Sequence, residues 1–399
     1  MLLRRDFLRL ITAAAGWASG TLAWGRNNPS RRILKNGMHY RLLGRTGLAV
    51  SEISLGGSPL PEWPLLLRII ERGVNYIDTS PSYGNGNSER QAGRLMKTVG
   101  RDKLFIGTKF HLRGPWSEES IVRSVEGSLS RLDTDCVDVL LIHGASEPEA
   151  LTDDRVLGAF DRMKKEGKCR FTGLSCHENH LAVVGRAVDC NRYDVITVGY
   201  NIYNIDDGGR ADALRGRQTG QDGFQGLLRR AAAKDIGIVA MKTLKSLVRM
   251  ADWKQLEPLT PQQAMLKWVL ADECVSSVVT EMMNMEEMEQ DLAVPGMPLT
   301  GAESRALARL AASSSRLVCR SCGACRSSCP ERLPIPGILR AWAYMECYGK
   351  KDRAREELDG IEARAVLSRC RDCGNCETAC PYGLGVRSKF LAVRGFLAA

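Results

Sequence analysis

The stretch GVNYIDTSPSYGNGNSERQAGRLM, residues 73–96, opens with a short apolar run, VNYIDTS (74–80), that is typical of a buried strand. Two side chains that can carry chemistry, Asp78 and Tyr83, lie at and just past the carboxyl end of this run. From Met38 onward, short apolar strands of this kind alternate with amphipathic helical stretches. The stretch is therefore one unit of a repeated strand–helix pattern.

Eight strand-like runs make up this pattern. They cover residues 49–57, 74–80, 104–110, 136–144, 169–176, 193–200, 236–243 and 274–280. Helical stretches such as 117–132 and 260–272 separate them. Eight strands with helices between them, over roughly 245 residues, predict an α/β fold, namely a closed parallel (β/α)8 TIM barrel. An open doubly wound sheet is the alternative, and it is disfavoured because no G-x-G-x-x-G motif follows an early strand.

The pattern changes after Pro295, where a helical stretch (300–317) leads into two cysteine motifs. The motifs are CRSCGACRSSCP, residues 319–330, and CRDCGNCETACP, residues 370–381. The segments 335–349 and 352–367 between them are helical in pattern. We therefore expect a barrel domain over 38–295 and a small, mainly α-helical ferredoxin-type domain over 296–399.

Both motifs have the spacing C-x2-C-x2-C-x3-C-P, which indicates two 4Fe–4S clusters. In such paired motifs the fourth cysteine of each run binds the other cluster. The predicted ligands are Cys319, Cys322, Cys325 and Cys380 for cluster one, and Cys370, Cys373, Cys376 and Cys329 for cluster two. Structural zinc is the alternative, but it does not explain the x3-C-P ending. Cys347, between the motifs, is expected to be a buried bystander.

The first 23 residues resemble a twin-arginine export signal, with Arg4 and Arg5 followed by the weakly apolar run LITAAAGWASGTLAW (10–24). This predicts a protein that is exported, for example to the periplasm, by the twin-arginine machinery. A membrane anchor is the alternative if the signal stays uncleaved. Residues 24–37 are polar and basic and are interpreted as a linker.

The formal net charge of the 399-residue chain is +10, but the basic residues are scattered. No module that combines aromatic and basic residues stands out, which argues against nucleic-acid binding.

Four residues lie at or just past three consecutive strand ends: Asp78, Tyr83, Lys109 and His143. In a TIM barrel these ends face the active site. Together with the segments MHYRLLGRTGLAVSEISLGG (38–57) and 73–96, they resemble the aldo-keto reductases over about Met38 to Leu292. The resemblance implies a small carbonyl or alcohol substrate, with a sugar as one candidate, and one family residue for each member of this tetrad.

The tetrad has an intelligible chemistry. Tyr83 would exchange the proton, although the ordinary tyrosine pKa of about 10 is high for that role. The Lys109 cation is expected to lower this pKa, and Asp78 to hold Lys109 in place. His143 would hydrogen-bond the substrate oxygen and orient it.

The family's nicotinamide contacts fall on Ser175, Cys176, Thr197 and Met241, and only the serine matches the usual residue type. Residues 281–291, where the family binds the adenosine phosphate, carry five acids and no base. A 2′-phosphate would meet like charge there, so NADPH is disfavoured in its usual mode and NADH less so. The sequence shows no flavin motif. A flavin is an alternative cofactor, because hydride transfer moves two electrons, a cluster moves one, and a flavin can mediate between them.

The main hypothesis is thus an exported oxidoreductase that couples carbonyl or alcohol chemistry to two 4Fe–4S clusters and a redox partner protein. A second hypothesis is an electron-transfer or docking protein with a degenerate nicotinamide site. A third is a nicotinamide-dependent reductase whose clusters are purely structural.

Overall fold

The computed structural model describes residues 32–112, 115–204, 223–243 and 252–398. The predicted export signal and residues 24–31 of the predicted linker lie outside these ranges. Eight parallel strands form a closed barrel in the order β10-β11-β4-β5-β6-β7-β8-β9, which confirms the predicted TIM barrel. The strands are β4 (Ile53–Gly56), β5 (Tyr76–Asp78), β6 (Phe105–Phe110), β7 (Val137–Ile142), β8 (Cys169–Cys176), β9 (Val195–Gly199), β10 (Gly237–Met241) and β11 (Ser277–Thr280). Each lies within one of the eight predicted runs.

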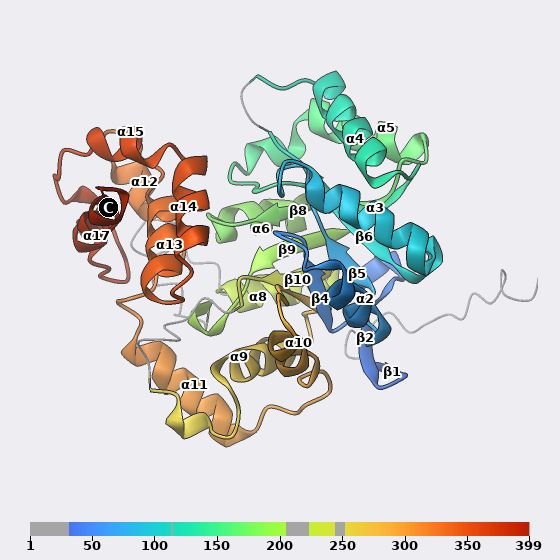
Figure 1. The fold of residues 1–399 in the computed structure, drawn as a ribbon. Coiled ribbons are helices and arrows are strands. Elements are labelled where there is room, and N and C mark those ends of the chain that lie inside the picture. Colours follow the sequence, from blue (N-terminus) through green and yellow to red (C-terminus); the bar gives the residue numbers. More distant parts are fainter. Residues whose placement is uncertain (1–31, 113–114, 205–222, 244–251, 399) are drawn as a thin grey trace, which may run out of the picture.

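Helices alternate with these strands and cover the barrel (Figure 1). They are α2 (Trp63–Glu71), α3 (Asn87–Val99), α4 (Glu118–Leu132), α5 (Asp154–Lys165), α6 (His180–Cys190), α8 (Phe224–Ala233), α9 (Pro261–Leu270) and α10 (Met285–Leu292). The local sequence determines where several of these helices begin. A capping box between Thr260 and Gln263 begins α9, and one between Ser117 and Ser120 begins α4.

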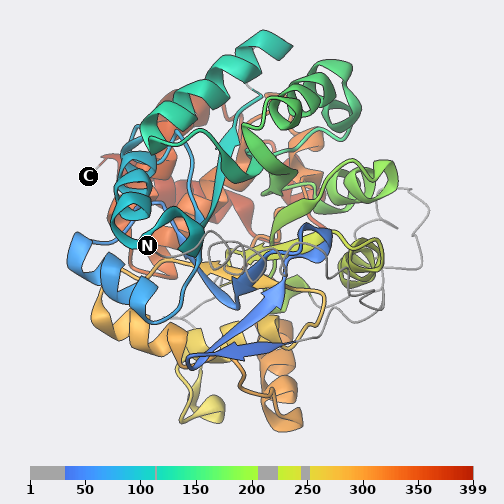
Figure 2. The same cartoon turned by 90° about the vertical axis from the view of Figure 1, so that its right-hand side faces the viewer.

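A small antiparallel sheet of β1 (Ile33–Lys35), β2 (Met38–Leu42) and β3 (Ala49–Ser51) closes the amino end of the barrel. Leu43, Leu48 and Val50, from this sheet and the loop within it, pack against the side chains that fill the barrel interior. In Figure 2 the sheet lies at the front, and the red C-terminal helices lie at the back. The two additions therefore occupy opposite sides of the barrel.

The assignment of residues 33–35 to a linker was wrong, because they form β1 and pair with β2. The turn between the strands is Asn36-Gly37, with φ values of 51° and 80°. A two-residue hairpin turn of this kind needs positive φ at both positions, which Asn and Gly tolerate. Asn-Gly was therefore the signal for a hairpin.

The C-terminal region is helical, as predicted. It contains α11 (Gly301–Ser313), α12 (Ala324–Ser328), α13 (Ile335–Glu346), α14 (Lys351–Gly360), α15 (Ala363–Ser368), α16 (Asn375–Thr378) and α17 (Val386–Ala398). The helical pattern over 352–367 is two helices rather than one. The chain breaks at Gly360, and Glu362 has a left-handed φ of 49°.

Hydrogen bonds and ion pairs connect this helical unit to the loops at the carboxyl ends of the barrel strands. The Asn179 amide donates a hydrogen bond to the Ser321 carbonyl at 3.0 Å. Arg326 and Glu178 form an ion pair at 2.8 Å, and Arg353 and Glu281 form one at 2.7 Å. Figure 1 shows α13 and α14 on this side of the barrel. The cysteine motifs therefore lie beside the barrel mouth.

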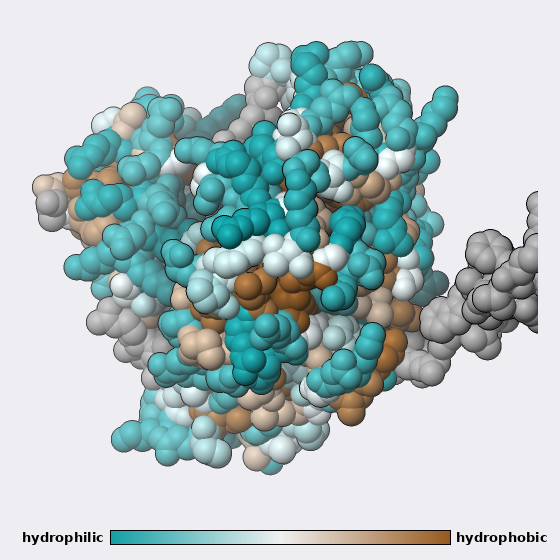
Figure 3. Space-filling view, turned by 45° about the vertical axis from the view of Figure 1, so that its right-hand side comes forward, coloured by the Kyte–Doolittle hydropathy of each residue, from teal (hydrophilic) through white to brown (hydrophobic). Residues whose placement is uncertain are grey.

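The molecular face in Figure 3 is mostly hydrophilic, with separate hydrophobic patches. Among the residues that the structure describes, no helix is both long enough and apolar enough to span a bilayer.

Candidate functional site

The barrel brings the four predicted strand-end residues together. Asp78 ends β5, Lys109 belongs to β6, and both side chains are buried and ion-paired. The Lys109 ammonium also donates to the Thr79 carbonyl at 2.8 Å and lies 3.4 Å from the Tyr83 hydroxyl. The Tyr83 and His143 rings meet edge to face, with centroids 5.6 Å apart. The four side chains thus form one group at the carboxyl ends of β5, β6 and β7.

The pKa of Tyr83 differs from the expectation that the Lys109 cation would lower it. Burial raises the pKa of Tyr83 above its ordinary value, and this effect exceeds the opposing effect of the Lys109 cation. Burial alone would lower the pKa of Lys109, but Asp78 and Tyr83 outweigh it, and the net shift is upward. Lys109 therefore stays a cation, and Tyr83 stays protonated near neutral pH.

The mouth also holds histidines that sequence reasoning did not select. His111 stacks on His143 with ring centroids 4.2 Å apart, and His177 lies 6.0 Å from His143. His143 is oriented by a contact of 3.0 Å between its Nδ1 and the Ser80 hydroxyl. His111 and His177 directly follow β6 and β8, so the strand-end rule that selected the tetrad could have found them.

The four predicted nicotinamide contacts, Ser175, Cys176, Thr197 and Met241, are all buried. The Ser175 hydroxyl accepts from the Gly144 amide at 2.9 Å and donates to the Ile142 carbonyl. The Cys176 thiol donates to the Glu178 carbonyl. Only the Thr197 hydroxyl has no hydrogen-bond partner within the described residues. Ser175 and Thr197 are paired on adjacent strands, whereas Cys176 points to the opposite face of β8 and packs in the core outside the barrel. The four residues therefore do not form one set of contacts for a nicotinamide carboxamide.

The acidic segment that follows β11, residues 281–291, has basic neighbours from a distant part of the sequence. Arg353 of α14 pairs with Glu281 at 2.7 Å, and Lys350 lies 3.9 Å from the same carboxylate. These bases come from the cysteine-rich domain. The negative charge of Glu281 is thus partly neutralised by the appended unit.

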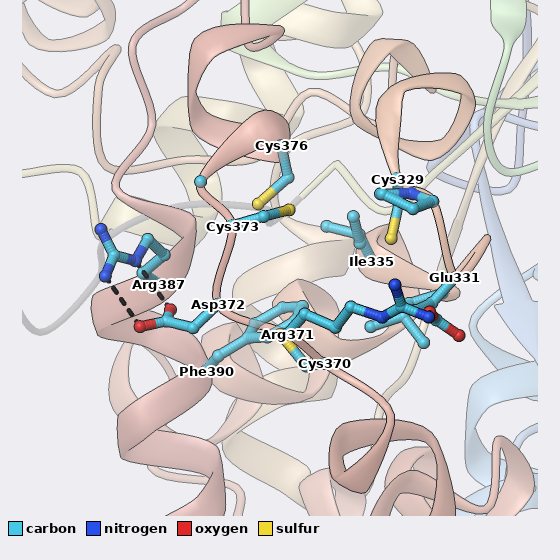
Figure 4. Close-up of a pocket in the computed structure, with 13 residues that line it drawn as sticks. Cys329, Glu331, Ile335, Cys370, Arg371, Asp372, Cys373, Cys376, Arg387 and Phe390 are labelled. Carbon is cyan, nitrogen blue, oxygen red and sulfur yellow. Dashed lines mark hydrogen bonds and ion pairs between the residues drawn. The ribbon is translucent and has the colours of Figure 1, made fainter.

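The predicted ligands of cluster two surround one cavity, which Cys329 from the first motif shares with Cys370, Cys373 and Cys376 from the second. In Figure 4 the sulfurs of Cys329, Cys373 and Cys376 point toward a common space, with Ile335 beside it. This grouping of one cysteine from the first motif with three from the second agrees with the ligand sets that the spacing predicts.

The predicted ligands of cluster one also lie together. Burial raises the pKa of the Cys325 thiol, and the neighbouring Cys319, Cys322 and Cys380 thiols raise it further. Across the described ranges, no three His, Cys, Asp or Glu side chains are close enough to share one metal ion. The preference for clusters over zinc therefore rests on the x3-C-P spacing of the motifs.

A (β/α)8 barrel with an Asp–Tyr–Lys–His group at its mouth, followed by a domain with paired iron–sulfur motifs, defines an oxidoreductase with a 4Fe–4S domain. The chain belongs to the aldo/keto reductase family, whose sequence model matches residues 63–312. The model of the 4Fe-4S dicluster domain matches residues 318–384.

Similar proteins include the L-galactose dehydrogenase of Arabidopsis thaliana, 33% identical over 35% of this chain and 48% of that protein. The chain thus spans about half the length of this curated relative. Among solved structures, aldo-keto reductase AKR11C1 from Bacillus halodurans is 22% identical, with a TM-score of 0.55 over 68% of this chain and 96% of its own. An aldo-keto reductase from Klebsiella pneumoniae in complex with NADPH is 23% identical, with a TM-score of 0.52 over 67% and 94%. At these identities the two structures establish a shared fold.

Proposed function

We propose that the protein is an exported oxidoreductase that interconverts a carbonyl and an alcohol at the barrel mouth and exchanges the electrons through two 4Fe–4S clusters. One observation carries this proposal. The loop of cluster one is hydrogen-bonded, through Ser321 and Asn179, to the loop that follows β8. Ser321 lies between the cluster ligands Cys319 and Cys322, so the first cluster site adjoins the mouth that holds the tetrad.

In this proposal the residues of the tetrad handle the proton. Tyr83 donates it to the oxygen of a carbonyl substrate, or accepts it from an alcohol in the reverse direction. Lys109, held by Asp78, stabilises the tyrosinate that forms, and His143 orients the substrate oxygen. General acid catalysis of this kind contributes about a hundred- to ten-thousand-fold.

Oxidation of an alcohol to a carbonyl releases two protons and two electrons. The eight motif cysteines would hold two clusters, which supply two one-electron sites when bound. Hydride moves both electrons together, whereas each cluster accepts one electron at a time. A carrier that accepts hydride and releases its electrons singly, such as a flavin, would therefore act between the substrate and cluster one. A nicotinamide would need such a mediator to reach the clusters. The NADPH complex of the Klebsiella relative supports a nicotinamide, whereas the buried Ser175 and Cys176 argue against the usual contacts.

The substrate would be a small carbonyl or alcohol. The name of the Arabidopsis relative, L-galactose dehydrogenase, supports a sugar or sugar derivative. A redox partner protein would exchange electrons at cluster two, because Cys373 is exposed.

The pair Arg4-Arg5 supports export by the twin-arginine machinery, which carries folded proteins and would deliver the clusters already assembled. The working compartment would then be the periplasm or the cell exterior, with a membrane anchor if the signal is retained.

The test is Tyr83→Phe in protein purified anaerobically, with turnover and iron content both measured. We expect turnover to fall by at least a hundredfold while iron content is unchanged. Tyr40→Phe is the matched control, because Tyr40 lies in β2 at the opposite end of the barrel, where its hydroxyl donates to the Gly73 carbonyl. Wild-type turnover in Tyr83→Phe would refute the proton donor.

The second candidate is an electron-transfer or docking protein, which the buried nicotinamide contacts favour. It predicts a redox-active iron–sulfur spectrum and no binding of NADH or NADPH by calorimetry. The third candidate, structural clusters beside a nicotinamide enzyme, predicts that substrate never changes the oxidation state of the clusters.

A further inference from the structure

A buried lysine of the cluster domain lies beside the site of cluster one. The domain has three lysines, of which Lys350 and Lys351 are exposed, whereas the side chain of Lys389 is buried. A lysine is rarely buried unless its charge is compensated. Lys389 belongs to α17 and lines a small cavity together with Cys347 and the predicted cluster ligand Cys319.

Two contacts hold the ammonium group of Lys389. It lies over the Trp342 ring of α13, 4.4 Å from the ring centroid, and 3.5 Å from the carbonyl oxygen of Gly385. Both contacts favour a cation, but neither partner carries a full negative charge. A bound cluster would supply such a charge, because its four thiolate ligands leave it anionic.

Lys389 is within electrostatic range of two ligands of that cluster. Burial lowers the pKa of Lys389 below its ordinary value, while neighbouring groups that can carry negative charge oppose this shift. These groups are Cys347, Cys319, Glu377 and Cys380. Cys319 and Cys380 come from different motifs and are both predicted ligands of cluster one. The ammonium group thus lies close to the point where the two motifs meet.

The cavity of cluster two has a different arrangement of charge. Its four charged lining residues form two ion pairs, with distances of 2.6 and 2.7 Å (Figure 4): Arg371 with Glu331, and Arg387 with Asp372. Lys389 does not line this cavity, whereas the next residue of α17, Phe390, does. Consecutive side chains of a helix point about 100° apart. Helix α17 therefore directs Lys389 toward cluster one and Phe390 toward cluster two.

We propose that the positive charge of Lys389 stabilises the reduced form of cluster one, and that it affects cluster two less. A cluster gains one negative charge when it accepts one electron, and a nearby cation in a buried site favours that state. Lys389 therefore raises the reduction potential of cluster one. The inference rests on the proposed function, in which cluster one is the site that adjoins the barrel mouth. Lys389 makes this site a better acceptor of electrons from the mouth.

The test is a redox titration of the full-length protein with its clusters loaded, in the absence of substrate. Dithionite supplies the electrons, and electron paramagnetic resonance follows each cluster. Lys389→Met removes the charge and keeps an unbranched side chain. We expect its cluster one to become about tenfold harder to reduce, which lowers the midpoint potential by about 59 mV for one electron. The shift of cluster two should be smaller. Lys389→Arg keeps the charge and should retain most of the wild-type potential.

Lys351→Met is the matched control, because it removes one positive charge from an exposed position of α14 that lines neither cavity. Cys373→Ser identifies the signal of cluster two, since Cys373 lines the cavity of that cluster. Iron content is measured for every variant, and Lys389→Gln replaces Lys389→Met if the latter binds less iron.

An unchanged potential of cluster one without the Lys389 charge, or an equal shift in Lys351→Met, would overturn the inference. An equal fall in Lys389→Arg, or loss of iron from all the Lys389 variants, would show that Lys389 acts by packing and not by charge. The titration needs no substrate, so its failure is distinct from failure of the proposed function. If Tyr83→Phe keeps full turnover while Lys389→Met lowers the potential of cluster one, the proton donor is wrong and the role of Lys389 stands.

Discussion

The ammonium nitrogen of Lys109 lies 3.4 Å from the hydroxyl oxygen of Tyr83, and the same ammonium group is ion-paired with Asp78. Two of these three groups, Asp78 and Lys109, are buried. Asp78 helps to keep Lys109 cationic, and the Lys109 cation opposes the upward effect of burial on the pKa of Tyr83. The predictions for the barrel follow from this arrangement.

The double variant Asp78→Asn/Lys109→Met should fold and lose turnover by about a hundred- to ten-thousand-fold, the usual contribution of a general acid. Without the cation, the pKa of Tyr83 should rise further. The measurement is the pH dependence of turnover, combined with an ultraviolet titration of tyrosine with Tyr83→Phe as reference. Lys109→Met alone is the comparison. It leaves the buried Asp78 carboxylate without its cationic partner and should lower the free energy of unfolding by about 3–5 kcal/mol. A fully active double variant would show that Tyr83 works without the lysine.

The cavity shared by Cys329, Cys370, Cys373 and Cys376 leads to a prediction about which cluster each cysteine serves. Cys380→Ser, although in the second motif, should damage cluster one, and Cys329→Ser should damage cluster two. Electron paramagnetic resonance of the reduced protein and iron content would check both. Cys136→Ser is the matched control, because Cys136 directly precedes β7 at the amino end of the barrel strands and lies outside both motifs. Loss of the same signal in all three variants would contradict the assignment.

The barrel and its tetrad could be predicted because both depend on local patterns. Each of the eight barrel strands is a short apolar run, and the carboxyl ends of such strands meet at one face in this fold. Asp78, Lys109 and His143 therefore had to converge once the strands were recognised. The cysteine motifs are equally local, since their spacing carries the ligand pattern.

The rest depends on contacts between distant parts of the chain. The pairing of Arg353 with Glu281 spans 72 residues, and nothing in either segment selects that partner among many surface charges. The raised pKa of Tyr83 depends on how deeply the folded chain buries it, which composition does not reveal. The hairpin strand β1 was missed for another reason. Its Asn-Gly turn was visible, but the basic residues around it suggested a linker.

The ion pair between Glu281 and Arg353 should help to hold the cluster domain on the barrel. Glu281→Lys would place a third cation beside Arg353 and Lys350 and should weaken this contact. Because both partners are partly exposed, we expect a loss of about 1 kcal/mol, or a few degrees in Tm. Combining Glu281→Lys with Arg353→Glu should recover part of the loss, as measured by Tm and by limited proteolysis. Equal loss in the single and double variants would show that the pair does not couple the domains.

Asp291 of α10 should make the stability of the barrel depend on pH. Burial raises its pKa to about 7, even though Gln262 donates a hydrogen bond to it, so the folded state favours the protonated acid. An unfolded Asp has a pKa of about 3.9. Its stabilising contribution is therefore complete below pH 4 and is lost as the pH rises to 7 and above, by about 4 kcal/mol for a shift of this size.

Asp291→Asn keeps an acceptor for Gln262 and cannot ionise, so it should match the wild type near pH 4 and unfold at a higher temperature at pH 8. Thermal unfolding across this range, on protein with its clusters loaded, would check the difference. Parallel curves for the two proteins would show that the carboxyl group does not titrate there.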